Sequence, residues 1–202
     1  MQGYSRSRED FRELLYSKYN YMYPFTKKVT TSKKSWGVNP CTGIVIHHTA
    51  GWTFESNMRY LSESPAQASV HFVIGPNWEC WKIWDPKDIL WHAGNGSRGW
   101  CENVNYKFLG IEVVWFGDFN IHQLMRLTDL VEYLMGNFPI DRENIVRHSD
   151  VTQNREITKQ RTLWDGKRKV KKTDIGLNFF ADNEHFKEWR SQLTPRKESV
   201  YN

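Results

Sequence analysis

The chain has 202 residues, which suits one globular domain with a short appendage, and a chain of this size buries about 70% of its unfolded surface without needing disulfides. The formal net charge of +5 favours anionic partners such as nucleic acid, anionic lipid or acidic cell-wall polymers. No run of about 18 apolar residues occurs, so a membrane-spanning helix is not expected.

The chain is rich in aromatic residues, with 10 Trp, 9 Tyr and 11 Phe. These rings indicate either a large rigid core or a groove that holds an extended ligand such as a glycan.

The three cysteines, Cys41, Cys80 and Cys101, have no CxxC spacing, which argues against a cysteine zinc site. They are typical of reduced thiols, with one disulfide and a spare thiol as the alternative. The N-terminus has no apolar segment typical of a signal peptide.

The N-terminal part predicts a short helix followed by a strand. Ser7 to Tyr16 carries a capping signal and helical apolar spacing, and a polar linker follows it. Gly43 to Ile46 is a continuous, mostly β-branched run, which predicts a strand buried on both faces. Phe54 to Leu61 predicts a short helix.

The remaining elements alternate between strand and helix. Strands are predicted over Ser69 to Ile74 and Glu79 to Trp84, joined by a turn, and over Phe108 to Trp115. Asn120 caps a helix with apolar residues at helical spacing, and a last helix is predicted over Asn183 to Leu193. We therefore expect an α/β fold with a single mixed central sheet flanked by helices.

This pattern divides the chain into three segments. Residues 1–40 are expected to form an N-terminal helical appendage and linker. Residues 41–195 form the main domain, and residues 196–202 form a flexible tail.

Histidines and an aspartate mark the candidate site. His47 and His48 follow the buried strand directly, and strand ends of α/β folds are where ligand sites open. His148 follows a short apolar stretch, and Asp174 lies further along the chain. Two imidazoles and a carboxylate leave one tetrahedral zinc position for water, as a hydrolytic zinc site requires. The alternative for each histidine is a hydrogen-bonded core residue.

Six short motifs carry a family resemblance. They are IVIHHTAG, SVHFVIG, WHAG, LGIEVV, RHSD and KTDIG, in that order, over about residues 43 to 180. Together they resemble the type 2 N-acetylmuramoyl-L-alanine amidases, a superfamily that includes phage endolysins, bacterial anhydromuropeptide amidases and animal peptidoglycan-recognition proteins. The resemblance implies the fold of that superfamily.

The resemblance also implies a metal site and two catalytic residues. One Zn²⁺ ion is expected on His47, His148 and Asp174. Glu112 of the LGIEVV motif is expected to act as the general base on the attacking water; if it points into a cleft, partial desolvation makes it a better proton acceptor. Lys172 is expected to stabilise the oxyanion, although it lies in a basic run of the kind that is usually solvated.

Four further residues are expected at the substrate groove. Trp91 and Tyr106 are candidates for stacking on sugar or stem-peptide groups, with a core role as the alternative. His92 is expected to line the groove. His71, placed on a central strand, is grouped with them, with a structural or supporting part.

The sequence departs from the family pattern in three places. Val70 stands where some relatives have a tyrosine that aids catalysis, and Ile175 stands where proline is usual. The segment between His148 and Lys172 is long and basic, and it makes Asp174 the least secure ligand. Asp150 is the weaker substitute for it.

The implied function is hydrolysis of the amide bond between muramic acid and L-alanine in bacterial peptidoglycan. We expect a phage endolysin, monomeric, that stays in the host cytoplasm until it is released to the wall. A virion-borne lysin and a cytosolic recycling enzyme are the alternatives. A non-catalytic peptidoglycan-binding module and a nucleic-acid-binding protein that uses the basic segment are competing hypotheses, although no standard nucleic-acid motif is present.

Overall fold

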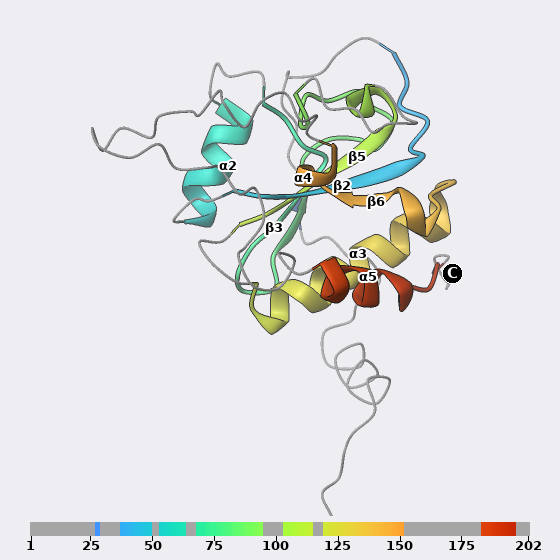
Figure 1. The fold of residues 1–202 in the computed structure, drawn as a ribbon. Coiled ribbons are helices and arrows are strands. Elements are labelled where there is room, and N and C mark those ends of the chain that lie inside the picture. Colours follow the sequence, from blue (N-terminus) through green and yellow to red (C-terminus); the bar gives the residue numbers. More distant parts are fainter. Residues whose placement is uncertain are drawn as a thin grey trace, which may run out of the picture.

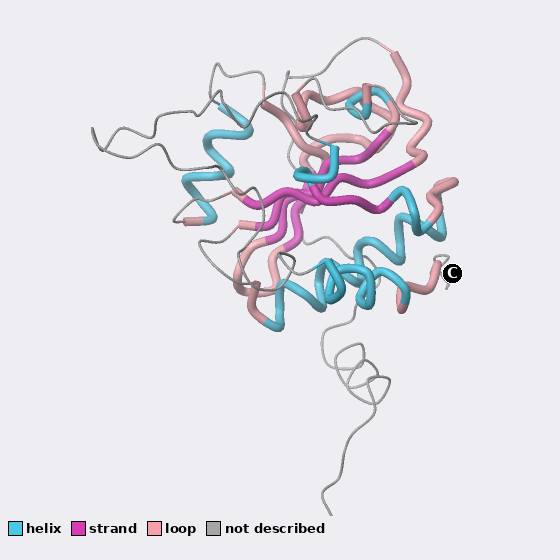
Figure 2. The backbone as a smooth tube through the Cα atoms, in the orientation of Figure 1, coloured by secondary structure: helices cyan, strands magenta, loops and turns pink. Residues whose placement is uncertain are grey.

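The computed structural model describes residues 27–28, 37–49, 53–63, 68–94, 103–114, 119–151 and 183–196. These residues form one mixed sheet with helices packed against it (Figures 1 and 2). The strands are β1 (Lys27–Lys28), β2 (Gly43–His48), β3 (Phe72–Ile74), β4 (Cys80–Lys82), β5 (Phe108–Val113) and β6 (Ile145–Arg147). The helices are α2 (Phe54–Glu63), α3 (Ile121–Asn137), α4 (His148–Val151) and α5 (Asn183–Ser191), with 3₁₀ turns η1 (Val104–Tyr106) and η2 (Arg142–Asn144).

The expected α/β fold is confirmed, and the predicted strands and helices within these residues are present. The helix predicted over Ser7 to Tyr16 lies outside the described residues, as does Trp115 at the end of the strand predicted from Phe108. The boundaries at residues 40 and 195 stay predictions.

The sheet has the strand order β1-β4-β3-β5-β2-β6. Strand β2 pairs in parallel with β5 and β6, and β3 pairs in parallel with β5, whereas β4 runs antiparallel to β3. The carboxyl ends of β2, β5 and β6 therefore meet at one edge of the sheet. In α/β sheets this is the edge at which ligand sites form.

Side chains of β2 alternate between two cores. Ile44 and Ile46 pack in the core beneath α3 and α5, and Val45 packs in a separate cluster on the opposite face. A further cluster lies under α2. All six residues of β2 are buried, which is why its sequence is apolar without alternation. The two faces of the sheet thus have separate apolar layers, and the odd-numbered residues of β2 face away from α3.

Helix α3 begins at the expected cap. The Asn120 side chain accepts a hydrogen bond from the Gln123 amide at 2.9 Å, and the Gln123 side chain accepts one from the Asn120 amide at 3.1 Å. This reciprocal capping box satisfies two amides of the first turn. Gln123 also donates to the carbonyl oxygen of Val114, at 2.8 Å, and so ties the helix to the end of β5.

Strands β3 and β4 are shorter than predicted. Regular pairing stops at Phe72 and Lys82, because the amides of Ile83 and Trp84 both approach the carbonyl oxygen of His71, at 2.9 and 3.3 Å. Two residues of one strand then oppose one of the other, as in a β-bulge. The chain before Phe72 is held instead by Ser69, which hydrogen-bonds with Trp91.

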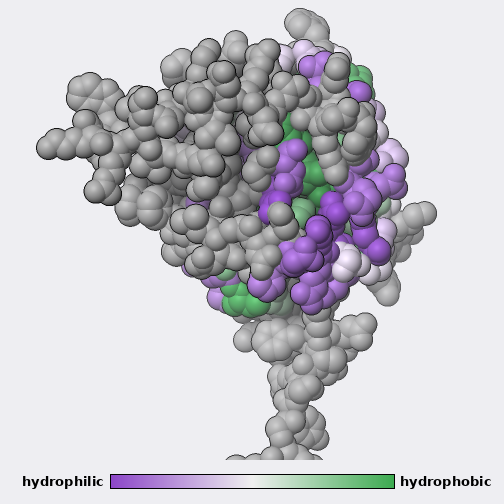
Figure 3. Space-filling model, in the orientation of Figure 1, coloured by the Kyte–Doolittle hydropathy of each residue, from purple (hydrophilic) through white to green (hydrophobic). Residues whose placement is uncertain are grey.

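Two of the three thiols lie among the described residues. Cys41 and Cys80 are buried thiols that form no disulfide with each other, and Cys101 lies outside the described part. No helix in the described ranges is long and apolar enough to cross a membrane. The face drawn in Figure 3 is mainly hydrophilic where it is described, with smaller hydrophobic areas.

Candidate active site

The carboxyl ends of three adjacent strands bring the main predicted site residues together. His47 of β2 and Glu112 of β5 are direct partners in the parallel register. Val45, two residues before His47, faces away from α3, so the alternation of side chains puts His47 and Glu112 on that same face. His148 comes directly after β6, on the other side of β2, as the first residue of α4. Neighbouring residues of the strands point to opposite faces, and His48 accordingly lies against Phe119, with ring centroids 5.8 Å apart.

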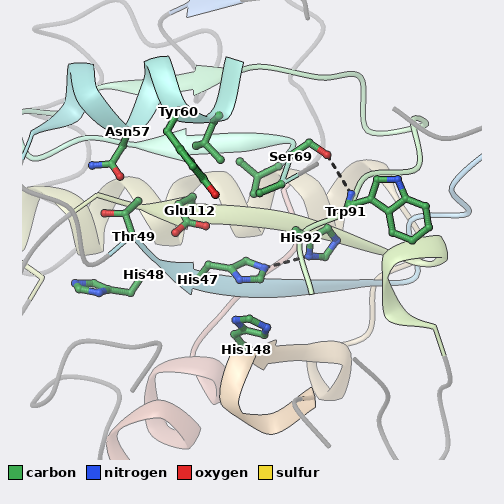
Figure 4. A pocket seen from close by; sticks show the side chains of 13 residues that line it. His47, His48, Thr49, Asn57, Tyr60, Ser69, Trp91, His92, Glu112 and His148 are labelled. Carbon is green, nitrogen blue, oxygen red and sulfur yellow. Dashed lines mark hydrogen bonds between the residues drawn. The ribbon is translucent and has the colours of Figure 1, made fainter. Parts of the chain in front are cut away.

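These residues line a cavity of about 220 Å³. Figure 4 shows the side chains around it, with the rings of His47 and His148 beside each other and the carboxylate of Glu112 close by. The full lining consists of His47, His48, Thr49, Asn57, Tyr60, Leu61, Ala68, Ser69, Val70, Trp91, His92, Glu112 and His148. The cavity therefore combines imidazole and carboxylate groups with aromatic and small apolar side chains.

His47 and His148 fit two ligands of one metal ion. Their ring centroids are 4.6 Å apart and their planes are inclined at 58°. Two imidazoles that share a tetrahedral zinc ion have centroids roughly 5 Å apart, given Zn–N bonds of ~2.0–2.1 Å. Within the described ranges, no group of three His, Cys, Asp or Glu side chains is arranged to hold a metal. Asp174, the third predicted ligand, and Lys172 lie outside these ranges.

Asp150, the alternative ligand, is engaged elsewhere. Its Oδ2 accepts hydrogen bonds from the backbone amide and Nε of Arg147, at 2.9 and 3.0 Å, and its Oδ1 accepts one from Nη2 at 2.8 Å. This bidentate pair encloses the turn from β6 into α4, where His148 lies. The structure thus gives Asp150 a role in orienting the chain around His148 and does not place it as a ligand.

His92 makes hydrogen bonds through both ring nitrogens. Nδ1 is 3.0 Å from Nε2 of His47, and Nε2 is 3.1 Å from the carbonyl oxygen of Phe108. Burial lowers the pKa of His92 to about 3, so its ring is neutral at physiological pH. The ring borders the cavity, and its polar atoms contact protein groups, which leaves ring carbons for any contact with a substrate.

His71 lies away from the cavity lining. Its Nδ1 accepts a hydrogen bond from the Gly110 amide, and its Nε2 approaches the carbonyl oxygen of Asp88, both at 2.9 Å. Burial lowers the pKa of His71 to about 4. The ring therefore ties β5 to the loop after β4.

The two aromatic residues predicted for the groove contact each other. Trp91 and Tyr106 meet edge to face, with ring centroids 5.7 Å apart. Trp91 lines the cavity and is held by hydrogen bonds with Ser69, whereas the Tyr106 side chain is 39% exposed. Trp91 lies at one end of the cavity (Figure 4), and Tyr106 packs against it from outside the lining.

Helix α2 supplies residues that the sequence interpretation missed. Asn57, Tyr60 and Leu61 line the cavity, and Tyr60 is 48% exposed. These residues occupy positions i, i+3 and i+4, the spacing that puts side chains on one face of a helix. That spacing was the available signal, although it does not show which helix face borders the site.

Comparison with solved structures defines the class of fold. AmpD, as a selenomethionine derivative, has a TM-score of 0.62 with 16% identity, over 81% of this chain and 93% of AmpD. AmpDh3 from Pseudomonas aeruginosa has a TM-score of 0.52 with 22% identity, over 64% of this chain and 58% of AmpDh3. AmiD of Escherichia coli, solved with the substrate anhydro-N-acetylmuramic acid-L-Ala-D-gamma-Glu-L-Lys, has a TM-score of 0.53. The chain has the α/β fold of these amidases.

Sequence comparison then identifies the family. Residues 37–162 match the family described as N-acetylmuramoyl-L-alanine amidase, and the chain belongs to that family. AmiD of Escherichia coli (strain K12) is 26% identical over 131 residues, covering 56% of this chain and 46% of AmiD. The matched region thus spans about half the length of this relative.

Proposed function

We propose that this protein is a zinc-dependent N-acetylmuramoyl-L-alanine amidase, which hydrolyses the amide bond between muramic acid and L-alanine in bacterial peptidoglycan. The proposal rests mainly on one observation: the side chains of His47, Glu112 and His148 line one cavity. These residues come from three adjacent strand ends, and all three lie in the region that matches the amidase family.

In this proposal His47, His148 and Asp174 hold one zinc ion. The donor set of two imidazoles and one carboxylate suits a catalytic zinc site with one open position. When bound, zinc would act as a Lewis acid on the scissile carbonyl and lower the pKa of water in the site.

Proton transfer and oxyanion stabilisation are assigned to two residues. Glu112 takes a proton from the attacking water as the carbon–oxygen bond forms, and it returns that proton to the nitrogen of L-alanine as the carbon–nitrogen bond breaks. Lys172 is assigned to the negative charge that develops on the carbonyl oxygen, a contribution of about 3 kcal/mol to the barrier by analogy with other oxyanion donors.

The substrate is assigned to peptidoglycan fragments that carry a muramyl peptide. AmiD has been solved with such a substrate, and the ring pair Trp91 and Tyr106 offers apolar surface of the kind that stacks on sugars. The net charge of +5 favours an anionic wall polymer. We extend the proposal to a lytic enzyme of the endolysin kind; faster cleavage of soluble anhydromuropeptides than of intact sacculi would favour a recycling enzyme instead.

The proposal is tested with Glu112→Gln, and with Glu184→Gln on the exposed side of α5 as the matched control. We expect Glu112→Gln to lower the hydrolysis rate about 10²- to 10⁴-fold at unchanged zinc content, and Glu184→Gln to leave the rate unchanged. Chelation is expected to abolish hydrolysis and added zinc to restore it. An unchanged rate in Glu112→Gln contradicts the mechanism. Tight muropeptide binding by metal-free protein without hydrolysis supports a recognition module.

A further inference from the structure

The His92 ring lies between a backbone carbonyl and the predicted zinc ligand His47. Its Nε2 is 3.1 Å from the carbonyl oxygen of Phe108, which also accepts a hydrogen bond from Asn39 at 3.1 Å. A carbonyl oxygen only accepts, so Nε2 of His92 must carry a hydrogen. The side chain is 9% exposed, and burial disfavours the imidazolium, so Nδ1 of His92 holds a lone pair.

This lone pair fixes the direction of the next hydrogen bond. Nδ1 of His92 is 3.0 Å from Nε2 of His47, and it accepts, so Nε2 of His47 carries the hydrogen and donates it (Figure 4). A neutral imidazole has one protonated nitrogen. In the neutral form that binds a metal, the lone pair of His47 is therefore on Nδ1, so Nδ1 is the nitrogen that would bond the metal.

The surroundings of His92 hold its ring in place. The Asn105 side chain, which is buried, accepts hydrogen bonds from the amides of His92 and Ala93, at 3.0 and 2.8 Å, and it donates to the carbonyl oxygen of Gly94. The His92 side chain packs closely against Gly110, where a Cβ would lie 2.6 Å from Cγ of His92. Both the backbone and the ring of His92 are thus fixed before any ligand binds.

We propose that His92 is a positioning residue, which fixes the tautomer and the orientation of His47 so that Nδ1 of His47 is presented to the metal. The hydrogen-bond direction depends only on the contacts above. The consequence for zinc rests on the proposed function. Residues that hold the second nitrogen of a metal-binding histidine typically affect metal affinity about 10- to 100-fold.

The hydrogen-bond direction is tested by NMR on metal-free protein labelled with ¹⁵N-histidine. We expect a slowly exchanging proton on Nε2 of His47 and a ¹⁵N–¹⁵N scalar coupling across the hydrogen bond to Nδ1 of His92. A proton on Nδ1 of His92, or the lack of any such coupling, overturns the proposal. This measurement needs neither zinc nor a variant.

The consequence for the metal is tested by zinc titration of three variants. His92→Phe keeps a flat ring but removes both nitrogens, and we expect its zinc affinity to fall about 10- to 100-fold. His92→Asn retains an acceptor near the position of Nδ1 and is expected to recover part of that loss. His122→Phe, a histidine-to-phenylalanine change on the stack with Trp78, is the control and is expected to bind zinc like the unaltered protein.

The two proposals fail in different ways. Equal zinc affinity in His92→Phe and the unaltered protein overturns the positioning role. If the unaltered protein binds no zinc, the proposed metal-dependent function fails, whereas the NMR result still decides the hydrogen-bond direction. If His92→Phe does not fold, His92→Asn and the NMR measurement carry the test.

Discussion

His71 makes the stability of this protein sensitive to acid. Its ring is fully buried, and both nitrogens are used: Nδ1 accepts from the Gly110 amide and Nε2 donates to the carbonyl oxygen of Asp88. A second proton has no place on this ring without breaking the bond from Gly110. The structure therefore favours the neutral ring, and the pKa of His71 is lowered from 6.5 to about 4 by burial.

The sign and size of the effect follow from this shift. Below pH 6.5 the unfolded chain binds a proton on His71 that the folded chain does not, until the folded ring titrates near pH 4. The free energy of unfolding therefore falls as the pH falls through this window, by about 1.4 kcal/mol per pH unit. At pH 5 the expected loss from this one residue is about 2 kcal/mol relative to neutral pH. His92, with a pKa lowered to about 3, contributes in the same direction.

The assay is urea denaturation across this pH window with a chelator present, on the unaltered protein and on His71→Gln. Glutamine offers a hydrogen-bond donor and an acceptor but does not titrate. The change in unfolding free energy at neutral pH therefore reports the lost contacts, and the change in its pH dependence reports the lost titration of His71. We expect the slope of unfolding free energy against pH to be smaller in His71→Gln by about 1.4 kcal/mol per pH unit. The contribution of His92 is common to both proteins and cancels. Equal slopes refute the reasoning.

Three more predictions follow from the described contacts. Asp150→Asn weakens the charge-assisted hydrogen bonds to Arg147. We expect it to lower the free energy of unfolding by about 1–2 kcal/mol in urea denaturation, and to lower the zinc affinity in a zinc titration. Unchanged values would contradict the orienting role. Burial raises the pKa of the Cys41 thiol to about 11 and also raises the pKa of the Cys80 thiol. We therefore expect both thiols to resist alkylation at pH 8 until denaturant is added, as measured by peptide mass mapping. Alkylation of either thiol in the native protein would contradict this packing. Gly43→Ala would put a Cβ 2.6 Å from the buried Phe108 ring on the neighbouring strand. We expect this substitution to lower the free energy of unfolding by about 1–3 kcal/mol in urea denaturation. An unchanged denaturation midpoint would show that the two strands separate more easily than we infer.

The sequence was most informative where local chemistry decides the structure. The apolar run from Gly43 to Ile46 predicted a strand buried on both faces because such a strand meets no solvent on either side. Helix α3 was predicted from its 3.6-residue spacing and from Asn120, whose short side chain caps the first turn. The cap of α3 is formed by neighbours in the chain, whereas the apolar run of β2 records its burial without identifying the elements that cover it.

Contacts between distant segments were not predictable in the same way. That His47 and Glu112 are adjacent depends on the register of β2 with β5, which is set by pairing and packing across the sheet. The contact between His47 and His92 joins residues 45 positions apart. The position of the His92 ring depends on the carbonyl oxygen of Phe108 and on the side chain of Asn105. No sequence pattern indicates these two contacts. The late start of β3 likewise depends on the carbonyl oxygen of His71, which two amides approach.

The most direct test of the proposed amidase function is mass spectrometry of purified peptidoglycan after digestion by the zinc-loaded protein. Hydrolysis of the proposed bond releases stem peptides with a new free amino group on L-alanine and leaves intact glycan strands that carry free lactyl carboxylates. We predict these products, and predict that they do not form with Glu112→Gln. Cleaved glycan strands, or peptides cut at another bond, would contradict the proposed function.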